Sequence, residues 1–164
     1  LHVDFGGDME MSDIFFGQMQ KAKVDYDLIG FSFYPWSHGN LMDLRDNLYY
    51  TIKKWQKPVI VVETGYYSVP SSYFERKGVK APYPETPEGQ KGWFQAVNEI
   101  VMAAPDNMGR GVYWWEPMFR GRGFFDDKTR VVKPIVEAFQ NYAYPMERAD
   151  GNPRIWDFEE GEKP

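Results

Sequence analysis

Apolar positions along the chain alternate between short continuous runs and stripes of helical spacing. Residues 28–34 and 58–62 are runs rich in Ile, Val and Phe, which favours strands buried on both faces of a parallel sheet. Between these runs, apolar residues recur every three or four positions, at Leu41, Leu44, Leu48, Ile52 and Trp55. That stripe predicts an amphipathic helix between two buried strands.

The same alternation is predicted toward the amino terminus. Residues 2–5 read as the end of a strand that stops at two glycines. Ser12 is expected to cap a helix that carries Ile14, Phe15 and Met19 on one side. This segment is the first of four predicted strand–helix units.

The third unit has a long loop at residues 66–85 between its strand at residues 58–62 and its helix. Thr86, Pro87 and Glu88 supply the hydroxyl, the proline and the acid that are typical of a helix start, and Pro105 is expected to end that helix. Residues 111–115 form the fourth predicted strand, and a fourth helix is predicted from about Pro134.

Strands that alternate with helices imply a parallel sheet with right-handed crossovers. Two architectures fit the order: an open doubly wound sheet, and part of a (β/α)8 TIM barrel. Gly6 and Gly7 after the first strand do not form the phosphate-binding loop that an open sheet of this kind usually carries. Because a whole barrel needs about 250 residues, we expect an α/β half-barrel over residues 1–145, followed by an irregular acidic tail over residues 146–164.

Composition narrows the class of protein. The 164 residues carry a net charge of −5 with no basic block, which argues against nucleic acid and anionic membranes as partners. No apolar run approaches the roughly 20 residues that span a bilayer. Aromatic residues make up 18% of the chain. Most Phe side chains are expected in the core, whereas Trp and Tyr faces also suit a carbohydrate site.

Carboxylates follow three of the four predicted strands, at Asp4, Glu63 and Glu116. The active sites of both architectures lie at the carboxyl ends of the strands. A single acid there is as readily a helix cap or a solvated strand end. Three acids interleaved with Trp and Tyr favour the paired-carboxylate chemistry of glycosidases, in which neighbouring acids hold different pKa values.

Histidine and metal chemistry are less prominent. His38 follows the second predicted strand and is either a surface loop residue or a hydrogen-bond donor to a sugar hydroxyl. The two histidines lie far apart and the chain has no cysteine, so neither a metal site nor another cofactor is expected. No G-x-S-x-G motif indicates a nucleophilic serine.

Four stretches at these strand ends resemble glycoside hydrolase family 53, the arabinogalactan endo-β-1,4-galactanases. They are DLIGFSFYPWSHG at 27–39, KPVIVVETGY at 57–66, YPETPEGQ at 83–90 and GVYWWEP at 111–117. Residues 124–126, with Pro134 and Ile135, also resemble the last strand-to-helix segment of the family. The similarity extends over most of residues 1–142.

The resemblance implies strands five to eight of a (β/α)8 barrel that hydrolyses β-1,4-galactan with retention of configuration. Glu63 then matches the catalytic nucleophile after strand seven, and Trp115 matches the tryptophan beside the cleaved bond. Four further positions match residues that line the same cleft and are substrate-binding candidates: Asp4, Tyr34, His38 and Glu116.

The acid/base glutamate of the family follows strand four, which would precede Leu1. The resemblance therefore implies a missing amino-terminal half as partner, an inactive isolated fragment, and extracellular or periplasmic action on a polysaccharide. Members of the family that bind calcium do so through longer loops after strands seven and eight. No calcium is expected here, because residues 68–80 lack the acidic ligands of those loops and the loop after Glu116 is short. Two other functions stay open: a non-catalytic carbohydrate-binding half-barrel or degenerate remnant, and an unrelated open-sheet enzyme.

Overall fold

A computed structural model describes residues 1–141, 146–147 and 153–154. At its centre is a four-stranded parallel sheet in the order β1-β2-β3-β4. The strands are β1 (His2–Val3), β2 (Ile29–Phe33), β3 (Val59–Thr64) and β4 (Gly109–Trp114). The helices are α1 (Met9–Lys21), α2 (Leu41–Trp55), α3 (Tyr73–Arg76), α4 (Pro87–Met102), the 3₁₀ turn η1 (Pro105–Asn107) and α5 (Ile135–Asn141).

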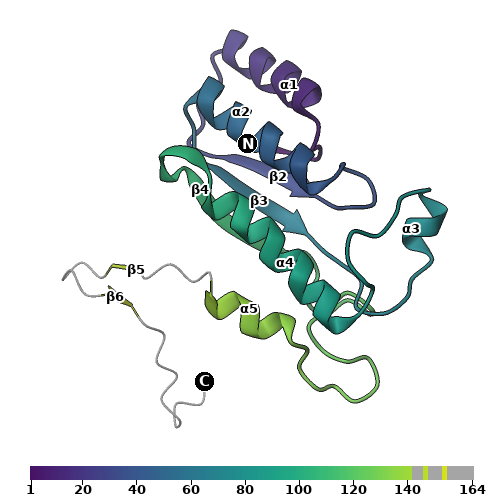
Figure 1. Cartoon of the computed structure of the whole chain (residues 1–164). Coiled ribbons are helices and arrows are strands. Elements are labelled where there is room, and N and C mark those ends of the chain that lie inside the picture. The colour runs from purple at the N-terminus through teal and green to yellow at the C-terminus, as the bar shows by residue number, and fades with distance from the viewer. Residues whose placement is uncertain (142–145, 148–152, 155–164) are drawn as a thin grey trace.

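Each strand pairs with the strand that follows it along the chain, and the connecting helices pack beside one another. Figure 1 shows α2 and α4 lying across the same face of the sheet. A doubly wound sheet would place helices on both faces and reverse its strand order at the centre. The open doubly wound alternative is therefore wrong, and the described residues have the winding of half a (β/α)8 barrel.

The first helix begins earlier than the sequence pattern indicates. Asp8, not Ser12, is the N-cap, and its carboxylate accepts a hydrogen bond from the Met11 amide. Ser12 lies one turn inside α1, where its buried hydroxyl donates to the Asp8 carbonyl. The core-facing side of α1 therefore passes through Phe16, which is fully buried, whereas Ile14 is 51% exposed.

The second predicted helix is confirmed. Asn40 and Asp43 form a capping box at its start, which satisfies amides that would otherwise lack partners. The stripe at Leu44, Leu48 and Ile52 is fully buried against the sheet. Periodicity and cap residues thus agree on both the start and the buried face of α2.

The third and fourth units also follow the predicted pattern, with shifted ends. Thr86 caps α4 by accepting from the Gly89 amide, and Pro87 is its first residue. The segment predicted as loop contains the single-turn helix α3. β4 begins at Gly109, two residues before the predicted start.

The two faces of the sheet differ in what covers them. Core residues such as Phe31 and Val61 point toward the helices and are fully buried. On the other face, a Cβ at Gly30 would lie 3.0 Å from Val62, and Tyr113 is 63% exposed. This second face corresponds to the inside of a barrel and is open in the described residues.

The tail expected to be irregular lies mostly outside the described residues. Its described parts, β5 (Met146–Glu147) and β6 (Pro153–Arg154), pair with each other as an antiparallel ladder. For the rest of the tail, irregular structure stays a prediction.

Candidate active site

A bulge in β3 places Glu63 at the rim of the inner face. Phe31 pairs with Val61 but Ser32 pairs with Glu63, so β3 contains one extra residue at this point. Bulges of this kind redirect a side chain near the end of a strand. Thr64 then returns to the helical side, where its hydroxyl donates to the Phe33 carbonyl and accepts from the Trp93 indole.

Tyr34 holds the Glu63 carboxylate. Its hydroxyl lies 3.1 Å from Oε2 of Glu63 and donates a hydrogen bond to it. Burial, followed by the nearby negative charge of Glu63, raises the pKa of Tyr34 well above its usual range. Tyr34 therefore keeps its proton and remains a donor. Its ring stacks on that of Trp36, with centroids 5.1 Å apart.

The His38 side chain is buried beside Tyr34, so its interpretation as a surface loop residue is wrong. Its side chain is only 8% exposed, and Nδ1 lies 3.0 Å from the Ser32 carbonyl and 3.2 Å from the Tyr34 amide nitrogen. Burial lowers the pKa of His38, and Asp4, whose carboxylate lies 3.6 Å from Nε2, opposes that shift. A neutral imidazole here braces the backbone of Tyr34.

Trp115 and Glu116 enter the site from the end of β4. The Trp115 amide donates a 2.8 Å hydrogen bond to the carbonyl of Thr64, the residue that follows Glu63. The Trp115 side chain is 46% exposed. Glu116 has a φ of 54° and accepts a 2.8 Å hydrogen bond from Arg122. The structure thus links Tyr34 to Glu63, and His38 to Asp4, and it sets Trp115 against the strand end that carries the nucleophile candidate.

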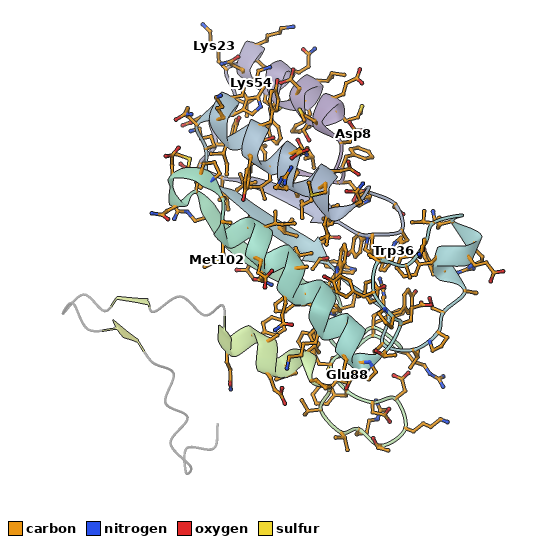
Figure 2. The ribbon with its side chains drawn as sticks, in the orientation of Figure 1. Asp8, Lys23, Trp36, Lys54, Glu88 and Met102 are labelled. Atoms are coloured by element: carbon orange, nitrogen blue, oxygen red, sulfur yellow. The ribbon has the colours of Figure 1, made fainter. Side chains whose placement is uncertain are left out.

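Arg122 is a site residue that sequence reasoning missed. Its guanidinium lies 5.8 Å from the Trp36 ring and 5.7 Å from the Tyr67 ring. Figure 2 shows Trp36 between the sheet and the loop that carries α3. The one signal in the sequence is the pair of glycines that flank Arg122. They permit a loop to pack closely, but they do not identify the residues against which it packs.

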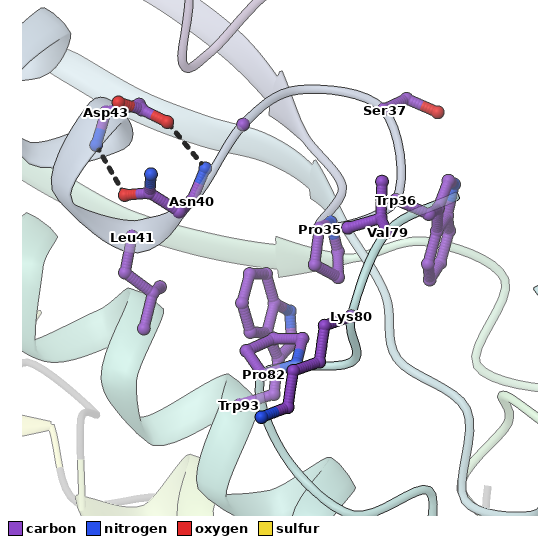
Figure 3. A pocket seen from close by; sticks show the side chains of 11 residues that line it. Pro35, Trp36, Ser37, Asn40, Leu41, Asp43, Val79, Lys80, Pro82 and Trp93 are labelled. Carbon is purple, nitrogen blue, oxygen red and sulfur yellow. Dashed lines mark hydrogen bonds between the residues drawn. The ribbon is translucent and has the colours of Figure 1, made fainter. Parts of the chain in front are cut away.

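A cavity of about 330 Å³ lies beside Trp36. It opens between the loop after β2 and the segment around Lys80 and Pro82, with Trp93 at its side (Figure 3). Trp36 borders the cavity, whereas Glu63 does not. The Glu63 carboxylate therefore lies outside this cavity.

The part of the chain that the structure describes offers no cluster of metal ligands. Its His, Asp and Glu side chains nowhere gather in groups of three or more that could hold an ion. None of the described helices is both long and apolar enough to cross a bilayer.

Comparison with known proteins agrees with the geometry. The family model described as Glycosyl hydrolase family 53 matches residues 1–150. An uncharacterized Niallia circulans protein from the bgaB 5′ region is 37% identical over 124 residues, covering 71% of this chain and 34% of that protein. A Bacillus subtilis endo-β-1,4-galactanase is 35% identical over 124 residues, covering 72% and 28% respectively.

Among solved structures, the GH53 catalytic domain of Ignisphaera aggregans superposes with a TM-score of 0.75 at 20% identity. The match covers 87% of this chain and 46% of that domain. The chain thus spans about a third of the length of the Niallia and Bacillus proteins and about half of this barrel domain. Its sheet is one part of a (β/α)8 barrel, and the chain belongs to glycoside hydrolase family 53.

Proposed function

We propose that this chain is the carboxyl-terminal half of a retaining endo-β-1,4-galactanase, with Glu63 as its nucleophile. The observation that carries the proposal is the Glu63 carboxylate at the carboxyl end of β3, held by the Tyr34 hydroxyl at 3.1 Å. Active sites of (β/α)8 barrels form at that end of the strands. The galactanase activity of the Bacillus subtilis relative supports the choice of substrate.

In the proposed reaction, an oxygen of Glu63 attacks the anomeric carbon of a galactosyl unit. The bond to the leaving sugar breaks as a second carboxylic acid gives its proton to the leaving oxygen. A water molecule, deprotonated by that second group, then cleaves the glycosyl ester and regenerates Glu63. Retaining enzymes hold the two carboxyl groups about 5–5.5 Å apart. We assign the second group to a strand that precedes Leu1 in the complete barrel.

The other site residues have distinct roles in this scheme. Tyr34 keeps the attacking carboxylate in one orientation, because a protonated phenol can only donate to it. Trp115 offers a half-exposed ring to a sugar face. Asp4 and Glu116 are exposed acceptors for sugar hydroxyls, and His38 acts through Asp4 and the Tyr34 backbone.

A chain that lacks the acid/base group should hydrolyse polysaccharide poorly, because general acid–base catalysis contributes about 10²–10⁴-fold. Full activity therefore requires the amino-terminal half of the barrel. A galactan polymer is too large to enter a cell intact, so we place the complete enzyme in the extracellular space or the periplasm.

The test is Glu63→Gln in the complete barrel, with reducing ends released from β-1,4-galactan as the measurement. We expect kcat to fall by more than about 10³-fold, as for the loss of a nucleophile elsewhere. Glu99→Gln is the matched control, since Glu99 is exposed on the outer helix α4, and it should leave the rate unchanged.

Galactan cleavage by Glu63→Gln at a rate near that of the unmodified barrel would contradict the assignment. Tight binding of galactan by the unmodified barrel without product release would instead favour the non-catalytic alternative.

A further inference from the structure

Arg122 is a largely buried cation at the point where the loops after β2, β3 and β4 meet. Its side chain is 13% exposed, and it lies in the loop between β4 and α5. The loops that follow β2 and β3 supply the rings of Trp36 and Tyr67 to its faces, and its own loop adds Phe119, with the guanidinium 4.4 Å from the ring centroid. Such stacking restricts the guanidinium to a narrow slot.

The backbone around Arg122 is equally fixed. The Gly121 carbonyl accepts hydrogen bonds from both the amide and the hydroxyl of Ser68. The Arg122 carbonyl accepts from the Gln90 amide group at 2.7 Å and from the Trp114 indole at 3.1 Å. Arg122 is thus tied to the loop after β3, to α4 and to the end of β4.

One polar contact of the guanidinium is directed at the cleft. Nη2 donates to Oε2 of Glu116 at 2.8 Å, whereas Nε is buried with no hydrogen-bond partner among the described residues. The Glu116 side chain is 42% exposed, and among the described residues its carboxylate accepts a hydrogen bond from Arg122 alone. A half-exposed glutamate on a solvent-facing loop otherwise samples several rotamers.

The charge of Arg122 also affects the pKa of Tyr34. Glu63 and Glu116 both raise the pKa of Tyr34, and Arg122 lowers it. All three charges therefore act on the residue that holds the nucleophile. Without Arg122, the negative charges of Glu63 and Glu116 would both lie near Tyr34, and no positive charge would offset that of Glu116.

We propose that Arg122 is a positioning residue that fixes the Glu116 carboxylate at the cleft rim as an acceptor for a substrate hydroxyl. This inference rests on the proposed galactanase function. It adds to the cleft a residue that never touches the sugar and acts through Glu116. A pre-ordered acceptor binds more tightly than a mobile one, because its rotamer entropy is not lost on binding.

The test compares Arg122→Met, Glu116→Ala and the double variant in the complete barrel. We expect Arg122→Met to raise KM for β-1,4-galactan about 10-fold to 100-fold, the range for a lost charge-assisted hydrogen bond, with kcat changed much less. The double variant should match Glu116→Ala alone, because the arginine acts through that carboxylate. Arg122→Lys, which keeps the charge but not the planar fork, should give an intermediate KM.

Arg120→Met is the matched control, since Arg120 is 87% exposed two residues away, and its KM should equal that of the unmodified barrel. The inference is overturned if Arg122→Met lowers only the melting temperature and leaves KM unchanged. It is also overturned if Glu116→Ala leaves KM unchanged, or if the two effects multiply in the double variant. Failure of the galactanase proposal is distinguishable, because either the unmodified barrel would release no product from β-1,4-galactan or Glu63→Gln would cleave it at the unmodified rate.

Discussion

Single residues at the strand ends differ in how far the sequence defines their roles. Glu63 and Asp4 could be assigned to one rim because parallel strands end at the same edge. The burial of His38 could not, since it depends on the loop after β2 folding back over its own strand. Arg122 was missed for a similar reason: its partners come from three loops whose packing no local pattern describes.

Burial of His38 predicts a pH-dependent loss of stability. Because its pKa in the folded state lies below the ordinary value of 6.5, the unfolded chain binds a proton that the folded chain does not. The free energy of unfolding should therefore fall as pH drops through about 6.5, by at most about 1.4 kcal/mol per pH unit. His38→Gln should flatten this dependence, measured by urea unfolding at a series of pH values between about 7.5 and 5.

Asp4→Asn tests the same titration by shifting the pKa of His38 while keeping the imidazole. The Asp4 carboxylate favours the protonated imidazole, so its removal should lower the pKa of His38 further and extend the loss of stability to lower pH. An unchanged pH dependence in both variants would show that His38 is not the titrating group.

Among the helices and strands, those with strong internal signals were predicted best. α2 has a buried stripe and a capping box, and β3 has a β-branched run. The start of α1 was misplaced because Asp8 and Ser12 are both capable caps, and only the packed structure decides between them. The bulge in β3 was not predicted, since it depends on pairing with β2.

One side chain of helix α4, that of Gln90, is expected to stabilise the loops after β3 and β4. The buried Gln90 amide group donates to the carbonyls of Tyr66 and Arg122. Gln90→Leu would leave both carbonyls without that donor, and we expect it to lower the free energy of unfolding by about 1–3 kcal/mol. Chemical denaturation of the chain measures this, with the exposed Gln18 on α1 replaced by Leu as the control.

If the proposed galactanase activity is correct, it should fall in the same Gln90 variant of the complete barrel, because the loops after β3 and β4 lose a hydrogen-bond donor that they share. A Gln90→Leu protein as stable as the Gln18→Leu protein would show that the two hydrogen bonds contribute nothing net.

For the whole molecule, the half-barrel was predictable from the number of strand–helix units, and its family from four short stretches. What the sequence did not show is how much apolar surface the fold leaves uncovered. Many of the exposed large apolar residues belong to the first and last strand–helix units, whose strands β1 and β4 are the open edges of the sheet. In the first unit they are Leu1, Phe5, Met9, Met11 and Ile14, and on β4 and the segment after it they are Tyr113, Trp115, Met118, Phe119, Val131 and Val132.

Uncovered strand edges and apolar surface of this kind favour association. We expect the isolated chain to show a mass above 19.2 kDa that rises with concentration in sedimentation equilibrium. Tyr113→Lys, on the open face of β4, should shift it toward monomer because a charge there would be buried in any face-to-face contact. Met42→Lys is the matched control, since Met42 is 54% exposed on α2, away from that face. A concentration-independent mass of 19.2 kDa for the unmodified chain would show that the open face does not drive association.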